Sequence, residues 1–519
     1  MRLSNYLDKG ASIDVDAACL TTDGETLNYG QVQTLSVRIA AGLAARGVGP
    51  GDKVAIISSN DPFAFTCVFG ISRLGAVWCP INPRNEAEEN RELLELSDCT
   101  VVFFAGAYAQ LVEKIRADLP LVHTWVCLDQ QHDDALGWDE FLDGGDGRDP
   151  GGVPVDDLAM VVGTGGTTGK PKGVMLTNHN LETMTAITLM SYPFTRTPVY
   201  LAMAPLTHAA GVLCFPILAL GGEIVIMRSA DVGQFLSNVE THRVTHSFLP
   251  PTIVYMILAD AGLDSTDLSS LECLWYGAAP MSPVRLEEAL ERIGPVMAQL
   301  FGQTEAPMMV STMEPRDHFF PDGSVATDRL RSAGRPSPLC TVAIMDADGS
   351  ILPRGERGEI VVRGSLVMDG YYKNPEATEE ATRFGWHHTG DIGYLDEDDY
   401  LFVVDRAKDM IITGGFNVYS TEVEQALLSH PDVQDCAVIG LPDDHWGEKV
   451  TAVVQLRRGG EVTMEELRAH VKDRIGSVKA PKRIEAWSDL PRSKVGKVLK
   501  VDIRDELLQA DPSATRLGG

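Results

Sequence analysis

The chain has 519 residues, more than one hydrophobic core usually supports, so we expect two or more domains. Its formal net charge of −29 argues against nucleic acid or an anionic membrane as the main partner. The nine cysteines are scattered and form no Cys-x-x-Cys pair, which argues against a disulfide framework or a zinc site and favours a reducing cytoplasm.

The chain also lacks the usual signals for export or membrane insertion. Residues 1–10 contain no apolar signal core. The longest uncharged apolar run, residues 209–222, is 14 residues long and is interrupted by Pro216. It is too short to span a bilayer, and we expect it to be part of the core.

The first four hundred residues alternate between helix and strand patterns. Val32, Leu35, Ile39 and Leu43 fall on one helical face, with Gly47 placed to end the helix. A strand is predicted at 53–58, a helix opened by a capping box of Asn85 and Glu88 and ending at Leu96, and a second strand at 100–104. This alternation predicts layered α/β structure with mostly parallel sheets.

An Asp- and Gly-rich stretch, residues 133–154, is predicted to be a surface loop, and a glycine-rich segment follows it at residues 162–173. That segment contains five glycines, three threonines and two lysines, after an apolar run at 158–162 that predicts a buried strand. Glycines let backbone N–H groups approach a ligand, while threonine and lysine add donors and positive charge. The segment favours a phosphate site over a flexible linker.

Two common nucleotide motifs do not fit this segment. A Walker A loop would need glycine at Thr164 and a hydroxyl residue at Pro171. A dinucleotide loop would need its third glycine at Thr168. The segment is therefore neither a P-loop of the kinase type nor a Rossmann fingerprint.

The pattern of predicted helices and strands changes near Asp405, after an acidic turn at 396–399. Residues 406–519 carry their own helix patterns at 421–428 and 464–475 and strand patterns at 437–440 and 450–455. We expect a large domain at 1–405 and a small α+β domain at 406–519. Residues 472–504 carry ten Lys or Arg against four Asp or Glu, which favours anion binding over the usual solvated charge run.

The glycine-rich segment resembles the phosphate loop of the adenylate-forming superfamily, usually Thr-Ser-Gly-Thr-Thr-Gly-x-Pro-Lys-Gly. Further motifs of that superfamily follow in order, and we identify them at residues 205–211 (Pro-Leu-Thr-His-Ala-Ala-Gly), 277–280 (Gly-Ala-Ala-Pro), 301–305 (Phe-Gly-Gln-Thr-Glu), 386–391 (Trp-His-His-Thr-Gly-Asp), 405–409 with 413–417, and 490–497. The match extends over about residues 29–500, and the longer motifs are specific in register. The chain is therefore similar to the acyl-CoA ligase branch of the superfamily.

The resemblance implies ATP or AMP, Mg²⁺ and CoA as ligands, and it implies a role for each matching residue. The nucleotide-binding residues would be Thr164, Gly165, Gly166, Thr167, Thr168, Gly169, Lys172, Gly277, Ala278, Ala279, Gly302, Gln303, Thr304, Asp391, Arg406 and Lys497. Glu305 would hold the metal, and Lys497, Glu305, Thr304 and His208 would be the catalytic set. Gly414, Gly415 and Phe416 would meet CoA, and Lys408 would be the hinge of a mobile small domain. A lone histidine such as His208 is more often a core residue.

The expected function is an AMP-forming acyl-CoA ligase that joins a carboxylic acid to CoA through an acyl-adenylate. A luciferase-like oxygenase and a non-catalytic acyl-adenylate binder are remote alternatives. A closer alternative follows from Gly165, which stands where the family usually has serine. The missing hydroxyl removes a bond to phosphate of about 1.5–3 kcal/mol, so the enzyme could instead transfer a preformed acyl-adenylate to CoA. The acyl group is not readable from the sequence, and a homodimer is one open oligomeric state.

Overall fold

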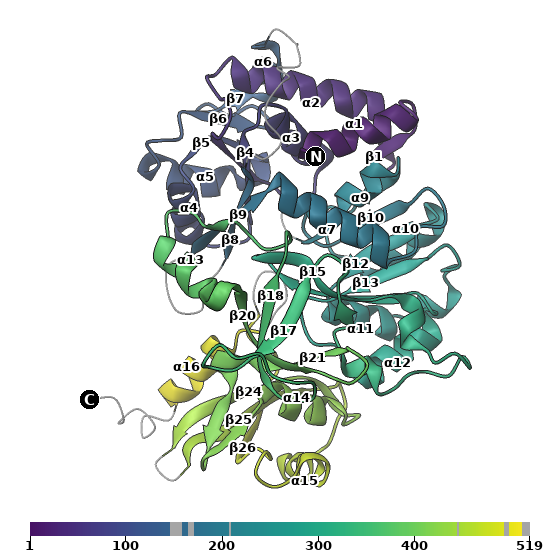
Figure 1. Cartoon of the computed structure of the whole chain (residues 1–519). Coiled ribbons are helices and arrows are strands. Elements are labelled where there is room, and N and C mark those ends of the chain that lie inside the picture. The colour runs from purple at the N-terminus through teal and green to yellow at the C-terminus, as the bar shows by residue number, and fades with distance from the viewer. Residues whose placement is uncertain (146–157, 165–170, 207–208, 444–445, 493–497, 511–519) are drawn as a thin grey trace.

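The computed structural model describes residues 1–145, 158–164, 171–206, 209–443, 446–492 and 498–510. Two large mixed sheets, a smaller antiparallel sheet and a C-terminal sheet build the protein (Figure 1). The predicted fold class, a large domain of layered, mostly parallel sheets with a small α+β domain, is confirmed. The small antiparallel sheet between these parts was not anticipated.

The first large sheet has nine strands, and it is parallel from β14 to β1 with antiparallel strands at both edges. In spatial order its strands are β16 (Arg335–Pro336), β15 (Ala306–Met313), β14 (Met297–Gln303), β13 (Cys273–Tyr276), β12 (His246–Leu249), β10 (Val199–Ala202), β11 (Glu223–Ile226), β1 (Ala18–Thr22) and β2 (Glu25–Asn28).

The second large sheet has eight strands, and it is parallel from β8 to β7. Its strands in order are β19 (Gly370–Tyr371), β9 (Lys172–Thr177), β8 (Leu158–Thr164), β4 (Val77–Ile81), β3 (Lys53–Ile57), β5 (Cys99–Phe104), β6 (Thr124–Cys127) and β7 (Leu136–Gly137). The phosphate-loop segment therefore leaves the sheet at the carboxyl end of β8.

Helices cover these sheets and join them. The large-domain helices are α1 (Leu3–Ile13), α2 (Tyr29–Ala44), α3 (Pro62–Arg73), α4 (Ala87–Leu96), α5 (Ala109–Ile115), α6 (Trp138–Asp143), α7 (Asn178–Ser191), α8 (Ala209–Val212), α9 (Cys214–Ala219), α10 (Val232–Thr241), α11 (Pro251–Ala259), α12 (Pro283–Arg292) and α13 (Pro375–Ala381). Helix α7 contacts β9 of one sheet and β15 of the other, so it lies between them (Figure 1). None of the described helices has both the length and the apolar character needed to cross a bilayer.

The smaller antiparallel sheet consists of β17 (Thr341–Met345), β18 (Gly358–Arg363), β20 (His387–Leu395) and β21 (Leu401–Arg406). The C-terminal part follows β21 and is drawn in yellow-green to yellow in Figure 1. Its sheet contains β23 (Phe416–Val418), β22 (Ile411–Thr413), β25 (Gly447–Leu456), β24 (Val433–Asp443) and β26 (Arg483–Ala486), with α14 (Ser420–Leu428), α15 (Met464–Ile475) and α16 (Lys500–Ala510). The domain boundary at residues 405–406 stays a prediction.

Two local expectations were wrong. Helix α4 begins at Ala87 with Glu86 as its N-cap, because Asn85 is held in a turn by its N–H bond to the Asn82 carbonyl. The expected loop at 133–154 contains β7 and α6, since Trp138 and Phe141 pack against Phe103 and make a local hydrophobic core. The Asp and Gly residues around this short apolar pattern concealed it.

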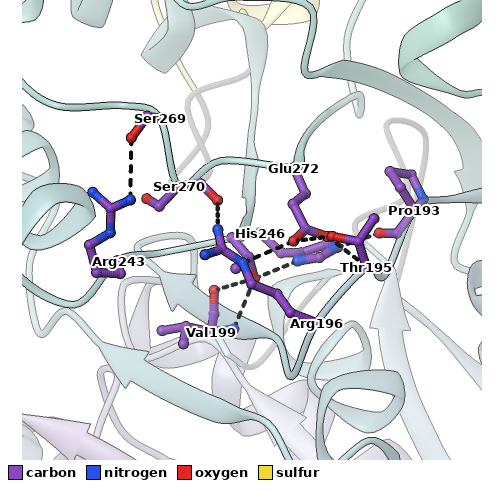
Figure 2. Close-up of polar contacts among 10 residues, drawn as sticks. Pro193, Thr195, Arg196, Val199, Arg243, His246, Ser269, Ser270 and Glu272 are labelled. Atoms are coloured by element: carbon purple, nitrogen blue, oxygen red, sulfur yellow. Dashed lines mark hydrogen bonds and ion pairs between the residues drawn. The ribbon is translucent and has the colours of Figure 1, made fainter.

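Figure 2 shows a polar cluster that lies at the amino-terminal ends of β10, β12 and β13 in the nine-stranded sheet. The motifs at 205–211 and 277–280 follow the carboxyl ends of β10 and β13. His246 is fully buried, and its Nε2–H donates to the Pro193 carbonyl over 2.9 Å. Glu272 accepts bonds from the backbone and hydroxyl of Thr195 and pairs with Arg196 Nε at 3.0 Å. Burial lowers the pKa of His246 to about 4, despite the opposing attraction of Glu272. A second buried histidine, His318, contacts the Tyr276 hydroxyl, and burial likewise lowers its pKa to about 4.

These buried histidines predict acid-sensitive stability. Both are neutral in the folded protein, so the unfolded chain binds more protons once the pH falls below about 6.5. The free energy of unfolding should fall between about pH 6.5 and pH 4, by on the order of 3 kcal/mol for each histidine. Denaturant titrations across this range test the slope. His246→Gln keeps an Nε2–H for Pro193 and should flatten the slope by about one proton. Equal slopes in wild type and His246→Gln would contradict the assignment.

Candidate nucleotide-binding site

The predicted site residues gather where strands of both large sheets end. Thr164 ends β8 and pairs in register with Lys172, the first residue of the antiparallel strand β9. The hydroxyl of Thr164 donates to the Lys172 carbonyl over 3.4 Å, so both ends of the phosphate loop are fixed by sheet pairing. Gly165, Gly166, Thr167, Thr168 and Gly169 lie outside the described residues.

Glu305 and Thr304 form the two-residue connection between β14 and β15. Gln303 and Ala306 pair across it, so the turn projects from the sheet edge. Gly302 is required here, because a Cβ would lie 2.6 Å from the backbone N of Met308 and 2.7 Å from the Ala306 carbonyl oxygen. A tight turn therefore displays a carboxylate at the carboxyl end of a parallel strand, where α/β sheets bind ligands.

The Glu305 carboxylate is tied to the phosphate-loop strands. Tyr371 donates its phenol hydrogen to Glu305 Oε1 over 2.8 Å, and the Lys172 ammonium lies 4.7 Å from the centroid of the Tyr371 ring. Tyr371 belongs to β19, which pairs with β9. No sequence motif pointed to Tyr371, because its contact with Glu305 arises only from the fold.

The small residues Gly277, Ala278 and Ala279 directly follow β13, which is the neighbour of β14 in the sheet. A Cβ on Gly277 would lie 2.5 Å from the Leu300 carbonyl oxygen, so only glycine fits against β14. Ala278 has a left-handed φ of 65°, a conformation that costs a non-glycine residue on the order of 1 kcal/mol. Such strain is typical of ligand-binding turns.

Asp391 and Arg406 face each other across β20 and β21. Arg406 Nε lies 3.0 Å from Asp391 Oδ1, and Asp391 is only 5% exposed. The preceding Thr389 is fixed by its hydroxyl bond to the Ile360 carbonyl, and Asp391 N–H donates to the same hydroxyl oxygen. The carboxylate is therefore held in one orientation, as an acceptor for two neighbouring hydroxyls would require.

The side chain of Gln303 points to protein rather than to an open site. Its Nε2 donates to the Thr389 carbonyl over 3.2 Å, and its Oε1 lies 3.0 Å from His387 Nε2. Burial lowers the pKa of His387, so the neutral ring donates from Nε2. Gln303 thereby fastens the strand that ends at Glu305 to the strand that carries Asp391. The predicted contact of Gln303 with the nucleotide stays a prediction.

Of the remaining predicted residues, Gly414, Gly415 and Phe416 lie at the turn between β22 and β23 of the C-terminal sheet. Gly414 and Gly415 form a left-handed turn between β22 and β23 with φ values of 57° and 81°, next to Phe416, which is 59% exposed. Lys408 sits in the short helical turn Ala407–Asp409, where partial desolvation and then Arg406 lower its pKa. His208 and Lys497 lie outside the described residues.

The basic stretch at 472–504 is less available for anions than its composition indicated. Its side chains form ion pairs within the small domain: Lys479 with Glu422, Arg483 with Glu485, Arg492 with Asp435, Lys500 with Glu424, and Arg504 with Glu448. Anion binding by this stretch stays a prediction.

Comparison with known proteins identifies the family to which the chain belongs. Residues 7–372 match the AMP-binding enzyme family, and residues 422–497 match the AMP-binding enzyme C-terminal domain. The chain is 37% identical to feruloyl-CoA synthase of an Amycolatopsis species over 97% of its own length and 98% of that protein. It is 41% identical to the medium/long-chain-fatty-acid–CoA ligase FadD8 of Mycobacterium tuberculosis over 68% of its own length, a match that spans 62% of that protein.

Among solved structures, the amide bond synthetase McbA of Marinactinospora thermotolerans superposes with a TM-score of 0.87 at 30% identity, covering 97% of this chain and 99% of that one. The order of motifs, the two matching domains and the relatives agree with one another. The chain belongs to the AMP-binding enzyme family, in the acyl-CoA ligase branch of the adenylate-forming superfamily.

Proposed function

We propose that this protein is an AMP-forming acyl-CoA ligase, which converts a carboxylic acid, ATP and CoA into an acyl-CoA through an acyl-adenylate. The observation that carries the proposal is the joining of Glu305 and Lys172 through Tyr371 at the end of β8. That arrangement brings a carboxylate and a phosphate-loop cation to one tyrosine, and a nucleoside triphosphate with its metal ion would use both groups. The family and its CoA ligase relatives support the reaction class.

In the first step a carboxylate oxygen of the acid attacks the α-phosphorus of ATP. A carbon–oxygen–phosphorus linkage forms, the bond from the α-phosphorus to its bridging oxygen breaks, and pyrophosphate leaves. Because two anions react, the protein has to supply fixed positive charge rather than a nucleophile. This positive charge would come from Lys172, Arg406 and Lys497. The Asp391 carboxylate would accept hydrogen bonds from the two ribose hydroxyls.

The donor set also fits a metal that arrives with the nucleotide. Mg²⁺ is usually bound by one or two carboxylates together with substrate phosphates and water. In the described ranges no group of three or more His, Cys, Asp or Glu side chains could hold a metal ion, whereas Glu305 offers a single oriented carboxylate. Glu305 would therefore hold Mg²⁺ against the phosphates, where the ion would neutralise charge on the departing pyrophosphate.

In the second step the sulfur of CoA attacks the acyl carbon of the adenylate. A carbon–sulfur bond forms, the bond to AMP breaks, and the thiol proton passes to solvent. Rotation of residues 406–519 about Lys408 would bring the glycine turn at Gly414 and the exposed Phe416 to the thiol arm.

The experiment that tests the proposal separates the two steps. We expect acid-dependent exchange of labelled pyrophosphate into ATP, and AMP release that requires both the acid and CoA. A panel of fatty and aromatic acids should be screened, with CoA and a simple amine as alternative acceptors, since the chain is also similar to an amide bond synthetase. Normal thioester formation from supplied acyl-AMP without any exchange would instead establish the preformed-adenylate alternative raised by Gly165.

Lys497→Ala should separate the half-reactions. The substitution removes the cation that would stabilise charge on the transferred group, so exchange should fall by at least about 100-fold. Thioester formation from supplied acyl-AMP should retain much of its rate. Lys494→Ala, three residues earlier in the same motif, is the matched control and should leave exchange largely intact. An equal loss of both half-reactions in Lys497→Ala would contradict the proposed division of labour.

Gly302→Ala tests the turn that displays Glu305. Its Cβ meets backbone atoms of Met308 and Ala306, which cannot move like a flexible side chain. A displacement of about 1 Å at Glu305 should lower exchange by about 100-fold, and overpacking should cost about 1–3 kcal/mol of stability. Gly233→Ala in α10, where the nearest atom is 3.5 Å away at Asp231, is the control. Wild-type exchange in Gly302→Ala would show that the turn does not position a reacting group.

A further inference from the structure

Tyr371 stands between the two groups on which the proposed function depends. It is 8% exposed, its hydroxyl donates to Glu305 Oε1 over 2.8 Å, and Lys172 Nζ lies 4.7 Å from its ring centroid. One side chain therefore contacts both the carboxylate and the phosphate-loop lysine. Glu305 and Tyr371 are 66 positions apart in sequence and lie on different sheets.

The backbone of Tyr371 is fixed on both sides. Strand β19 pairs Tyr371 with Val174 of β9, and the N–H of Tyr371 donates to the Thr378 hydroxyl over 2.9 Å. The next residue, Tyr372, donates its N–H to the Gly173 carbonyl over 2.8 Å. The phenol is therefore carried by a strand that pairs with β9, the strand that follows the phosphate loop.

Glu305 is constrained from the same direction. The N–H of Met368 donates to the Glu305 carbonyl oxygen over 2.8 Å, so the segment leading to Tyr371 also fixes the Glu305 backbone. The phenol engages Oε1, so Oε2 is the oxygen that would bind a cation. Burial and then the charge of Glu305 raise the pKa of Tyr371, so its hydroxyl keeps the proton that it donates.

The ring contact acts together with the hydroxyl bond. An ammonium over an aromatic face is attracted to the electron density of the ring. Donation of the phenol hydrogen to a carboxylate increases that density, so the two contacts strengthen each other.

We propose that Tyr371 is a positioning residue that couples the metal-binding carboxylate of Glu305 to Lys172 of the phosphate loop. This inference rests on the proposed function, because it assigns the coupling to the binding of ATP with its divalent cation. Tyr371 itself need not touch the nucleotide.

The neighbouring tyrosine is a matched control. Tyr372 donates its hydroxyl to Asp98 Oδ2 over 2.8 Å, and the ammonium groups of Lys53 and Lys373 lie 5.0 Å and 5.5 Å from its ring centroid. It makes the same two kinds of contact, with groups outside the proposed site. Tyr371→Phe and Tyr372→Phe therefore delete the same chemistry at adjacent positions.

The primary measurement is the affinity for ATP by calorimetry, without acid or CoA, first with Mg²⁺ and then with EDTA. The dissociation constant in EDTA divided by that in Mg²⁺ gives the factor by which the cation strengthens ATP binding. Tyr371→Phe should reduce this ratio by about 10-fold, the value of one hydrogen bond to a charged group, while the affinity in EDTA is kept. Tyr371→Leu also removes the ring and should weaken binding in EDTA by a further roughly 2- to 5-fold. Tyr372→Phe should match the wild type.

Activity gives a second readout. In pyrophosphate exchange, Tyr371→Phe should raise the half-saturating Mg²⁺ concentration by about 10-fold, with the maximal rate recovering at high Mg²⁺. A general loss of structure would lower the maximal rate instead. In the Glu305→Gln background, adding Tyr371→Phe should change the Mg²⁺ ratio little further, because the acceptor charge is already gone.

The outcomes distinguish the two proposals. If the wild type binds ATP and exchanges pyrophosphate but Tyr371→Phe behaves like Tyr372→Phe, the positioning role is wrong and the proposed function stands. Additive effects of Glu305→Gln and Tyr371→Phe would also overturn the coupling. If the wild type neither binds ATP nor exchanges pyrophosphate with any acid, the proposed function fails and this inference fails with it.

Discussion

The constraint that organises this protein is charge. Its chemistry brings a carboxylate to a phosphate inside a chain whose formal net charge is −29. Long-range attraction cannot gather anionic ligands under those conditions, so positive charge has to be placed at short range. Several basic residues of the C-terminal stretch are committed to ion pairs with neighbouring acids, Lys500 with Glu424 among them. Among the described residues, Lys172 and Arg406 are two cations that the structure positions at the proposed site.

Charged groups are also paired with specific neighbours at the junction with the small domain. Asp405, 4% exposed, accepts bonds from the backbone and the hydroxyl of Ser420 at the start of α14. Lys500 donates to the same hydroxyl over 2.6 Å and pairs with Glu424, whose pKa is raised by burial. Arg357 of the large domain stacks on Tyr419 at 5.1 Å. A rotation about Lys408 would have to break the contacts of Asp405 with Ser420 and of Arg357 with Tyr419, whereas the contacts of Lys500 lie within the small domain and would be kept.

The sequence predicted those elements whose signal is local. The helix expected at 464–475 has those bounds in the structure because Thr463 and Glu466 form a capping box immediately before it. The strand before the phosphate loop was likewise found from its apolar run. Asn85 is not the helix cap, because its N–H is bonded to the Asn82 carbonyl in a turn that precedes the helix. The helix that begins at Trp138 was missed, because Asp and Gly residues flank its short apolar pattern. Motif order identified Glu305 and Asp391, but nothing in the sequence could join Tyr371 to Glu305, since only the pairing of β19 with β9 brings them together.

Gln303 and Tyr371 together show how this site is assembled. Gln303 belongs to a motif, yet its side chain joins β14 to β20 through Thr389 and His387. Tyr371 lies outside the recognised motifs, yet it contacts the carboxylate that would hold the metal. A motif residue can therefore fasten strands of two different sheets to each other, and a residue outside every motif can contact a group on which the proposed chemistry depends. The nucleotide site is best understood as a set of strand ends fastened to one another, with Glu305 fixed from both sheets at once.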